Sequence, residues 1–464
     1  MEKPMNPQAK NSRLPADFEL TDDFRGAFDL IENSGNSVFV TGRAGTGKST
    51  FLEYFRENTQ KTAVYLAPTG VAALNVRGKT IHSLFKFPHV VITSDAIKDN
   101  KYSGITKQIL KSVNVIVIDE ISMVRADLIE GMDYILKKIR ENSLPFGGAQ
   151  MVFVGDMYQL PPVVSSNDKV NITHEGETVF EGSIHHYFER KYRGYYFFNS
   201  DVFKKSTFEH YVLETVFRQR SDFNFLQILN AVREGKVTDE LLAELNGRYF
   251  PKIEDGGDRE IVLGSTNSIV DGINKRKMDE LPTKEFVYCA ELSGVFEFTV
   301  NEKDYPVEKN LILKEGAQVM MVKNDKAGCW VNGTIGIIKK LEQSEITVDI
   351  DGTDFVANKE TWEAVDYEYD PANDKLATKA IGEYKQYPIK LAWAITVHKS
   401  QGKTFEKVII DLGGGAFAHG QTYVALSRCK TLEGIRLKQP VKRKDIILDD
   451  KVMNFMAGIT AAKS

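Results

Sequence analysis

The sequence contains little cysteine, and its cysteines are not arranged to build a site. The 464 residues include three cysteines, Cys289, Cys329 and Cys429, which lie 40 and 100 residues apart. No two of them form a Cys-x-x-Cys pair. Neither a zinc knuckle nor a disulfide framework is therefore expected, and a reducing compartment fits the sequence.

Long apolar segments are also absent. No run of 18 apolar residues occurs, so no helix is expected to span a membrane. The first residues, MEKPMNPQAKNSRLP, have no apolar core and no amphipathic stretch, which is unlike a secretory signal or a mitochondrial presequence. The sequence therefore predicts a soluble, cytoplasmic protein.

The chain has no excess of basic residues. Lys and Arg number 60 against 64 Asp and Glu, which gives a formal charge of −4 and excludes a histone-like DNA coat. A local groove can nevertheless be positive on an acidic protein, so nucleic acid is not excluded as a partner. Hydrophobic residues at 42% and charged residues at 27% are typical of a globular chain of two to four domains.

Short apolar strands alternate with helices in the first part of the chain. The segments SVFVTG, TAVYLA, VNVIVIDE and QMVFVGD are each followed by helix-like sequence, and DDFRGAFDLIEN before them has helical spacing. This alternation predicts a parallel sheet covered by helices on both faces. We assign residues 1–17 to a tail and 18–210 to this first lobe.

A second α/β series begins after Tyr211 and is interrupted by a different pattern. Residues 294–383 show β-branched alternation, with turn signals at Asn332-Gly333 and Asp351-Gly352. The sequence therefore predicts a small all-β domain at 294–383, inserted into a second lobe made of 211–293 and 384–464.

Two segments have alternative interpretations. Residues 351–387 carry nine Asp or Glu against four Lys, which indicates a solvated face or a partner surface. Residues 180–198 hold eight aromatic residues, which indicates a packed core or a platform for stacking bases. We favour the solvated face and the packed core. His185 and His186 have no partner at metal-binding spacing, and we expect them at the surface.

A glycine-rich loop carries the clearest chemical signal. Residues 42–49, GRAGTGKS, fit the P-loop pattern and lie between a predicted strand and a predicted helix. Its backbone N–H groups surround phosphates, Lys48 reaches the β and γ phosphates, and the Ser49 hydroxyl coordinates Mg²⁺. The predicted nucleotide-binding residues are Gly42, Gly45, Thr46, Gly47, Lys48, Ser49 and Thr50.

Polar residues at two further strand ends complete a hydrolytic site. Asp119 ends the buried strand VIVIDE and is expected to hold Mg²⁺, while Glu120 orients and polarises the attacking water. Gln159, in VGDMYQLPPV, is positioned to sense the γ-phosphate. The sequence thus predicts an enzyme that hydrolyses ATP with Mg²⁺.

These motifs together resemble the Pif-type DNA helicases of superfamily one, B branch. The resemblance rests on the segments GRAGTGKST, LAPTGVAAL, GKTIHSLF, VIDEISMV, PFGGAQMVFVGDMYQLPPV, LETVFRQ, LGSTNSIVDGINKRKM, LAWAITVHKSQGKTF and GQTYVALSRCKTLEGI. It covers nearly the whole chain from about Leu20. It implies two RecA-like lobes, a small wedge within about 75–107, and a barrel of the Src-homology-three kind at the inserted segment.

The resemblance also implies functional residues beyond the P-loop. Arg218 and Arg428 match two arginines that reach the γ-phosphate from the second lobe. The residues that match strand-contacting segments are Thr69, Gly70, His82, Thr266, Asn267, His398, Lys399 and Ser400. The partners implied are single-stranded DNA, tailed duplexes, and G-quadruplexes or RNA–DNA hybrids. The resemblance also implies 5′-to-3′ movement, and with it we expect a monomer at the bacterial nucleoid, with roles in DNA repair, recombination and telomere maintenance.

This chain departs from the family at two places. Relatives carry Gln in a pattern like L-S-x-E-Q to read adenine, whereas LTDDF places Phe24 there. Residues 164–194 match no known segment. The alternative function is a nucleotide-switched DNA-binding ATPase without strand separation, and further alternatives are an RNA helicase or an exonuclease subunit.

Overall fold

The computed structural model describes residues 14, 18–164, 169–174, 177–219, 222–255, 259–298, 305–325, 328–370 and 375–461. The tail predicted at 1–17 lies outside these residues, apart from Leu14. The chain forms two compact units. The first comprises Met1–Asp156, Pro162–Phe217 and Asp366–Lys379, and the second comprises Met157–Pro161, Arg218–Val365 and Ala380–Ser464.

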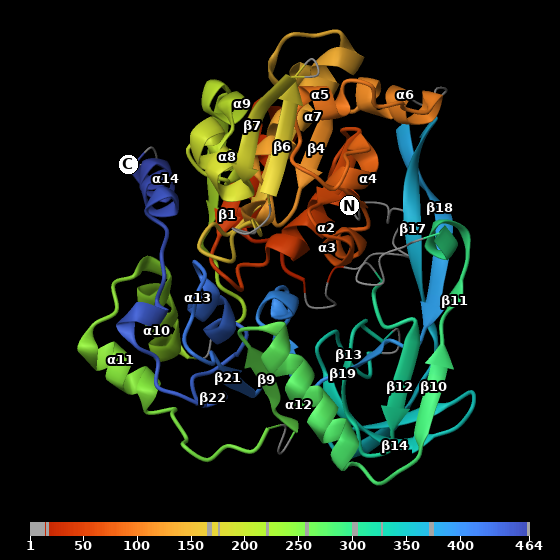
Figure 1. The fold of residues 1–464 in the computed structure, drawn as a ribbon, viewed down its shortest axis with the longest axis vertical. Coiled ribbons are helices and arrows are strands. Elements are labelled where there is room, and N and C mark those ends of the chain that lie inside the picture. The colour runs from red at the N-terminus through yellow and green to blue at the C-terminus, as the bar shows by residue number, and fades with distance from the viewer. Residues whose placement is uncertain are drawn as a thin grey trace, which may run out of the picture. The chain divides into compact units, whose positions relative to one another are not determined.

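The first unit is built on a six-stranded parallel sheet in the order β3-β2-β4-β5-β1-β8. Two of its strands, β1 and β4, are labelled in Figure 1. The strands are β1 (Ser37–Gly42), β2 (Ala63–Ala67), β3 (Lys79–Thr80), β4 (Val115–Ile118), β5 (Gln150–Gly155) and β8 (Phe208–Leu213). All residues of β4 and β5 are buried, as expected for strands covered on both faces. The parallel sheet predicted for this lobe is confirmed.

Strand β8 corrects the lobe boundary predicted at 210/211. Its residues pair with β1 from Ser37↔Phe208 to Gly42↔Leu213, so the strand continues through that boundary, and the unit extends to Phe217. No helical pattern separates Phe208 from the next α/β series in the sequence, so the pattern alone does not show that β8 belongs to the first sheet.

Helices follow the strands of the first unit at the predicted places. They are α1 (Asp22–Asn33), α2 (Lys48–Asn58), α3 (Gly70–Asn75), α4 (Ile81–Phe85), α5 (Ser94–Ile97), α6 (Gly104–Ser112), α7 (Ala126–Arg140) and α9 (Asp201–Lys205). Helix α1 buries Phe24, Ala27 and Ile31 at helical spacing, and the Thr21 hydroxyl caps its N-terminus. Short 3-10 turns lie at Ile121–Met123, Pro145–Gly148 and Phe197–Asn199.

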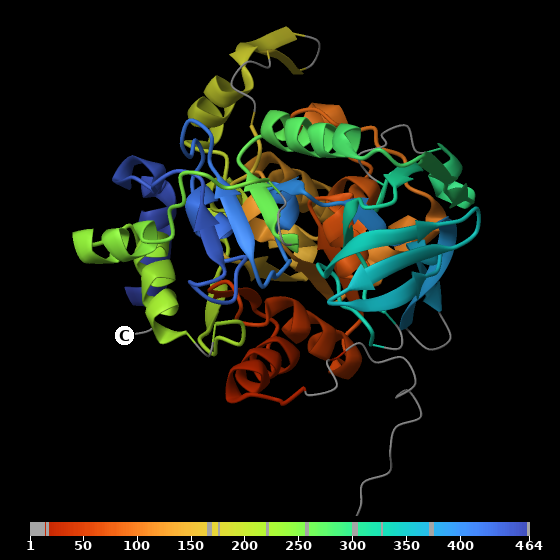
Figure 2. The same cartoon turned by 90° about the horizontal axis from the view of Figure 1, so that it is seen from below.

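The segment that the sequence analysis leaves unassigned to any family motif, within residues 164–194, contains a hairpin and a helix. Strands β6 (Lys169–His174) and β7 (Glu177–Ser183) pair antiparallel and lead into α8 (Ile184–Tyr192). Figure 2 shows this insert, in yellow, extending away from the red and orange part of the first unit. A core of Phe180, Tyr187, Phe188 and Tyr192 holds it, so the packed-core interpretation is confirmed. His185 and His186 are exposed, as predicted.

The second unit contains a four-stranded parallel sheet in the order β20-β9-β21-β22. Its strands are β9 (Ile261–Gly264), β20 (Ala394–Thr396), β21 (Val408–Asp411) and β22 (Ile435–Leu437). The helices are α10 (Phe223–Glu234), α11 (Asp239–Asn246), α12 (Asn267–Glu280), α13 (Gln421–Leu426) and α14 (Asp450–Ala461), with short 3-10 turns at His398–Ser400 and Arg443–Asp445. Helix α12 lies alongside β9 and β20 (Figure 1).

The predicted all-β segment is confirmed, although it is longer than 294–383. A five-stranded antiparallel sheet has the order β16-β15-β14-β13-β19. Its strands are β13 (Gln318–Met321), β14 (Ile335–Leu341), β15 (Ile346–Ile350), β16 (Thr353–Ala357) and β19 (Ile389–Leu391). The turn between β15 and β16 places Asp351 and Gly352 at φ 51° and 85°, as the Asp-Gly signal predicts.

Two smaller sheets also belong to the β region. Strands β10 (Glu285–Cys289) and β12 (Asn310–Lys314) pair antiparallel, and β11 (Glu291–Leu292), β17 (Glu360–Asp370) and β18 (Lys375–Gln386) form a three-stranded sheet, with a 3-10 turn at Gly294–Phe298. The β region therefore begins at Glu285 and ends at Leu391. The segment IKLAWAIT contains two strands: β19 belongs to the antiparallel sheet and β20 to the parallel one.

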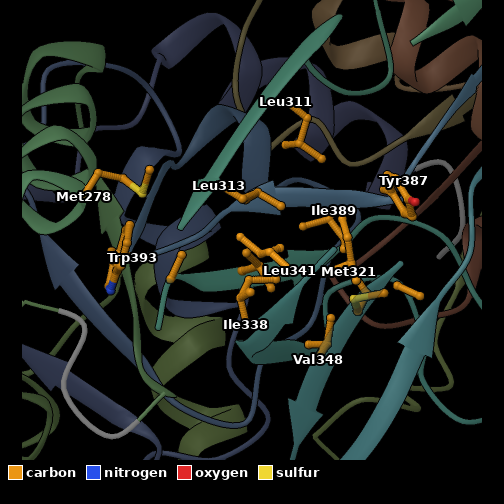
Figure 3. Close-up of a cluster of buried hydrophobic side chains, with 14 of the residues drawn as sticks. Met278, Leu311, Leu313, Met321, Ile338, Leu341, Val348, Tyr387, Ile389 and Trp393 are labelled. Atoms are coloured by element: carbon orange, nitrogen blue, oxygen red, sulfur yellow. The ribbon is translucent and has the colours of Figure 1, made fainter. Parts of the chain in front are cut away.

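The β region and the parallel sheet share one hydrophobic core. Figure 3 shows Met278 of α12 and Trp393, which precedes β20, beside side chains of the β region such as Leu313 and Ile338. All four are buried. Because one core serves both parts, the β region does not pack as an independent module within the second unit.

The end of the β17–β18 hairpin folds with the first unit. Tyr367 is 3% exposed, and its hydroxyl donates to the Tyr65 carbonyl at 3.2 Å and accepts from the Tyr65 N–H at 2.8 Å. Asp366 pairs with the buried Lys79 at 2.7 Å. Part of the acidic run at 351–387 therefore makes internal contacts.

Among the described residues, no helix is long and apolar enough to cross a membrane.

Candidate functional site

The P-loop lies where β1 ends and α2 begins, as the sequence predicts. Gly45 and Gly47 have φ of 84° and 76°, which are values that glycine adopts without strain. Gly47 is the N-cap of α2, so the first N–H groups of that helix face the loop. The Lys48 ammonium donates to the carbonyl oxygens of Gly42 and Arg43 at 2.8 and 3.0 Å.

Close packing explains the first glycine of the motif. A Cβ on Gly42 would lie 2.6 Å from the Thr46 hydroxyl and 2.8 Å from the Leu213 carbonyl oxygen. Thr46 is buried, and its hydroxyl donates to the Arg43 carbonyl at 3.0 Å. Gly42 and Thr46 therefore shape the loop, whereas Ser49 is exposed and its hydroxyl can reach a cation.

Asp119 and Glu120 follow β4 in the same sheet. Burial and the Glu120 carboxylate raise the pKa of Asp119, and Lys48 opposes that rise, so the ammonium and the carboxylate lie near each other. Glu120 has φ 50°, an unfavourable conformation for a residue with a side chain. The backbone N–H of Glu120 donates to Asp119 Oδ1 at 2.9 Å. This geometry suits a cation ligand followed by a water-orienting base.

Aromatic rings cover the P-loop beside Gly47. A Cβ on Gly47 would lie 2.9 Å from the ring of Phe24 and 3.2 Å from that of Phe217. Phe24 is 2% exposed and packs against Phe18, Phe51 and Phe217. Phe24 is thus a core residue, and Phe217, which is 36% exposed, is a ring that sequence reasoning missed.

Gln159 requires a correction, because it was placed in the first lobe. The segment Met157–Pro161 belongs to the second unit. His419 Nε2 lies 2.9 Å from the Met157 carbonyl, and the Arg233 guanidinium lies over the Tyr158 ring at 4.0 Å. Gln159 itself is buried, with its Oε1 accepting from Gln401 at 3.5 Å. Packing against these side chains decides its position, and sequence order does not reveal it.

Arg218 and Arg428 lie together in the second unit. Arg218 donates to the Ser427 carbonyl at 3.0 Å, and Arg428, which is 2% exposed, donates to the Ser400 and Lys403 carbonyls at 3.3 and 3.5 Å. Burial, and then the Arg428 charge, lower the pKa of Arg218 to about 9. The two guanidinium groups repel each other, and burial weakens their hydration. An anion placed between them would therefore be strongly stabilised.

Several predicted strand-contacting residues also have structural roles. The hydroxyls of Thr69 and Thr266 cap α3 and α12. Ser400 is fully buried, and its hydroxyl donates to the Val397 carbonyl at 2.7 Å. Gly70 and Asn267 are the first residues of those two helices. These five residues are brought to helix starts and a tight turn, where backbone N–H groups can meet phosphates.

The three remaining predicted residues carry side chains that nucleic acid could contact. His82 stacks on His89 with ring centroids 4.9 Å apart, and burial, then His89, lower its pKa to about 4. His398 is half-buried with a lowered pKa, also because of burial, and Lys399 is exposed. At neutral pH both histidines are uncharged, so they can contact a strand through stacking and hydrogen bonds.

The structure adds two lysines and an asparagine that the sequence did not reveal. Lys403 donates to Asn332 Oδ1 at 2.7 Å, which joins the predicted Asn332-Gly333 turn to the loop that carries His398. Burial, and then Lys390, lower the pKa of Lys403 to about 8. Burial and the charge of Lys399 also lower the pKa of Lys390, on β19, although Glu308 opposes them. Only the fold brings β19 and this loop together.

Comparison with known proteins agrees with this geometry. The PIF1-like helicase family matches residues 19–179, and the 2B domain of DNA helicase Pif1 matches residues 300–341. The ATP-dependent DNA helicase Pif1 of Bdellovibrio bacteriovorus is 34% identical over 445 residues, covering 95% of this chain and 92% of the relative. The human ATP-dependent DNA helicase PIF1 is 31% identical, covering 93% of this chain and 62% of the relative.

Solved structures are similar over almost the full length. Pif1 from Bacteroides sp in complex with ADP-AlF4 is 35% identical, with a TM-score of 0.84, over 96% of this chain and 98% of that one. Bacteroides Pif1 bound to single-stranded DNA covers the same shares with a TM-score of 0.68.

The fold and the site define a P-loop nucleoside triphosphatase with RecA-like parallel sheets and an added antiparallel β region. Its motifs, and the relatives that share them over most of their length, make it a helicase. The chain belongs to the PIF1-like helicase family.

Proposed function

We propose that this helicase hydrolyses ATP to move along single-stranded DNA in the 5′-to-3′ direction and to separate duplexes. As a PIF1-like helicase it is an ATP-hydrolysing DNA helicase, and the direction of movement is the finer proposal. The observation that carries the coupling is Arg428, whose guanidinium hydrogen-bonds the carbonyls of Ser400 and Lys403. A residue assigned to the γ-phosphate thus holds the loop assigned to the DNA strand.

The catalytic roles follow from the chemistry of each group. Lys48 holds the β and γ phosphates, and Glu120 orients the attacking water. Mg²⁺ fits the exposed Ser49 hydroxyl and the Asp119 carboxylate, because a hydroxyl, a carboxylate and phosphate oxygens are the ligands this cation takes at such sites. A bound cation would also lower the raised pKa of Asp119. Arg218 and Arg428 stabilise the charge that develops on the γ-phosphate.

Movement requires the nucleotide state to change the grip on DNA. When Arg428 turns to the γ-phosphate, its bonds to the Ser400 and Lys403 carbonyls are exchanged for bonds to phosphate oxygens. The loop that carries His398 and Lys399 is then free to shift. Hydrolysis restores the bonds seen here, so the strand grip alternates with each ATP.

The nucleotide base is held by stacking in this proposal. Position 24 carries no hydrogen-bonding group, and Asp23 Oδ2 already accepts from the N–H groups of Glu214 and Thr215. The half-exposed ring of Phe217 beside Gly47 offers a face on which a purine can stack. We therefore infer weak selection for adenine.

The partners implied by the family remain proposals for this chain. The related Bacteroides structures include one bound to single-stranded DNA and one at forked duplex DNA. We propose the same substrates here, with G-quadruplexes and RNA–DNA hybrids as further ones, and a monomer as the acting form at the bacterial nucleoid.

One experiment separates this function from its alternatives. ATPase turnover is measured with and without single-stranded DNA or RNA, followed by unwinding of duplexes with a 5′ or a 3′ tail. Stimulation by DNA with unwinding of the 5′-tailed duplex supports the proposal. Stimulation without unwinding supports a nucleotide-switched DNA-binding ATPase, preference for RNA supports an RNA helicase, and degradation of the strand supports an exonuclease subunit.

A further inference from the structure

The insert carries an exposed cluster of cations that the proposed cycle does not use. We define the α8–α9 basic surface as Arg190, Lys191, Arg193, Lys204 and Lys205, all of them exposed. The Lys204 ammonium lies 3.5 Å from the Tyr192 carbonyl oxygen, which brings the end of α9 to the end of α8. The five side chains therefore gather around one place of the first unit.

Charge is not balanced at this place. Residues 184–205 hold five Lys or Arg against Glu189 and Asp201. Two further carboxylates lie close by, Glu181 beside Arg190 and Glu130, which accepts from the Val202 N–H, so five cations stand against four carboxylates in a chain whose net charge is −4. Across the described ranges, no carboxylate forms an ion pair with any of the five cations, whereas other surface lysines such as Lys339 and Lys359 are paired. Desolvation costs little at an exposed cation, so these charges are available to a polyanion.

The helix dipole accounts for only part of this clustering. Cations are favoured in the last turn of a helix by about 0.3–1 kcal/mol, and one per helix meets that preference. Five cations at two adjoining helix ends exceed it. The β6–β7 hairpin and α8 also extend away from the rest of the first unit, where a large ligand can approach them (Figure 2).

The surroundings of the surface select the kind of polyanion. Phe180, Tyr187, Phe188 and Tyr192 are at most 9% exposed, so their faces are closed to unpaired bases. Proteins that hold single strands stack bases on exposed aromatic rings, whereas binding to a duplex backbone depends mainly on cations. The exposed rings beside this surface are the two imidazoles of His185 and His186, and the four larger rings are buried. An open hollow of about 460 Å³ adjoins the surface, and its lining includes Ser183, His186 and Arg190 but also the carboxylate of Glu181, so we assign the backbone contact to the five exposed cations and not to the hollow.

We propose that the α8–α9 basic surface binds the phosphate backbone of duplex DNA, independently of its sequence, in addition to the strand site of the helicase. This inference rests on the proposed action on DNA. A duplex held there would keep the enzyme near a junction while the strand grip is released during the ATP cycle.

The test compares two variants with a matched control. The triple variant Arg190→Gln, Lys191→Gln, Arg193→Gln and the double variant Lys204→Gln, Lys205→Gln remove the surface charges. The control Lys252→Gln, Lys275→Gln, Lys444→Gln removes three exposed charges elsewhere. Affinities for a blunt duplex and for a single-stranded oligonucleotide are measured by fluorescence anisotropy over a series of salt concentrations, with melting temperature as the check on folding.

The expected result is specific to the duplex. In the triple variant, duplex affinity falls at least tenfold at low salt, and the slope of log K against log salt falls by about 2–3, since each lost phosphate contact contributes about 0.9. Single-strand affinity and DNA-stimulated ATPase stay within about twofold. Replacing Arg190 and Arg193 by Lys should leave the slope unchanged, because the proposal needs charge and not a planar fork.

Two outcomes would overturn the inference. Equal loss of duplex and single-strand affinity would assign the surface to the strand track. A duplex slope that falls no more in the triple variant than in the control would show that the surface does not bind duplex DNA. Failure of the proposed function is distinguishable from both, because the unmodified enzyme would then lack DNA-stimulated ATPase and unwinding.

Discussion

Two cationic residues that we propose to contact ATP donate hydrogen bonds to backbone carbonyls. In this structure the Lys48 ammonium donates to two P-loop carbonyls, and the Arg428 guanidinium donates to carbonyls of its own unit. Each cation is thus kept in position by partners weaker than a phosphate, which can be exchanged when the nucleotide binds. The effect of a substitution on ATP binding or turnover therefore depends on which of these hydrogen bonds to phosphate it removes.

Lys48 and Glu120 should separate binding from hydrolysis. Lys48→Ala removes the phosphate contact and is expected to weaken ATP binding and abolish ATP-dependent activity. Glu120→Gln keeps Asp119, the proposed Mg²⁺ ligand, but removes the proposed base, so it should bind ATP normally and turn over at least 10²-fold more slowly. Titration with a fluorescent ATP analogue and single-turnover hydrolysis check both. Equal loss of affinity in the two variants would contradict these roles.

Arg428 should contribute to turnover far more than to ATP affinity. Arg428→Lys keeps a charge but cannot bond two oxygens at once, and it should lower DNA-stimulated turnover by about 10³-fold, as for other arginines that act on the γ-phosphate. Because the side chain is fully buried, the melting temperature is measured as well. Turnover within about threefold of the parent, in a folded variant, would reduce Arg428 to a structural residue.

Phe24 should make the enzyme tolerant of the base. Sites that recognise a substrate by hydrogen bonds give kcat/KM values about 10⁴–10⁵-fold lower for analogues that lack the bonding group. In apolar sites the difference in kcat/KM is only about 10–200-fold. We therefore expect kcat/KM for ATP and GTP to differ by no more than about 10²-fold. Phe24→Gln should raise the preference for ATP, with Phe24→Leu as the control for the loss of the ring. A parent enzyme that rejects GTP by 10⁴-fold would contradict this prediction.

Elements of the β region cannot be treated as exchangeable modules. Strands β13 and β19 share a core with α12 and with Trp393, and β17–β18 delivers Asp366 and Tyr367 to the first unit. Replacing residues 294–383 by a linker would therefore expose two cores. Point substitutions at polar contacts give a cleaner test of what each element contributes.

The tip of the β17–β18 hairpin should stabilise the first unit. Tyr367→Phe removes a hydroxyl that donates to the Tyr65 carbonyl and accepts from its N–H. Because Tyr65 is buried, the loss should destabilise the first unit by about 1–3 kcal/mol, measured by urea unfolding. Asp366→Asn, at a half-exposed site, should have a smaller effect. A neutral Tyr367→Phe would show that these backbone groups find other partners.

At the scale of the whole molecule, electrostatics and stability depend on a few buried groups more than on net charge. The chain is slightly acidic, yet Lys390, Lys399 and Lys403 gather at one place of the second unit, and the α8–α9 basic surface gathers five further cations in the first. A helicase that must release DNA in every cycle needs such local sites and no large positive field.

Acid should destabilise the whole protein in part through His82. Its pKa is about 4 in the fold, because of burial and the charges of His89 and Arg125, although Asp127 opposes them. The unfolded chain protonates near 6.5, so it binds more protons between pH 6.5 and 4. The stability that neutral His82 contributes to the folded state is fully present above pH 6.5 and is lost as the pH falls toward 4. The melting temperature should therefore drop less for His82→Gln than for the parent between pH 7 and 4.5, and equal drops would exclude His82 as a cause.

The sequence by itself determined the parallel first sheet, the P-loop, the acid pair and the β segment, because these depend on local patterns. A run of buried β-branched residues, a glycine that needs positive φ, or an Asp-Gly turn acts within a few residues. The same is true of the helical spacing in α1, which buries Phe24.

Only the tertiary structure decided which distant segments meet. It joined β8 to the first sheet, divided Ile389–Thr396 between two sheets, moved Gln159 to the second unit, and brought Lys403 to Asn332. Such contacts depend on the packing of surfaces that are far apart in sequence. Neither the periodicity nor the motifs of the sequence predict these contacts, because the local pattern of each segment is the same whether or not the other segment packs against it.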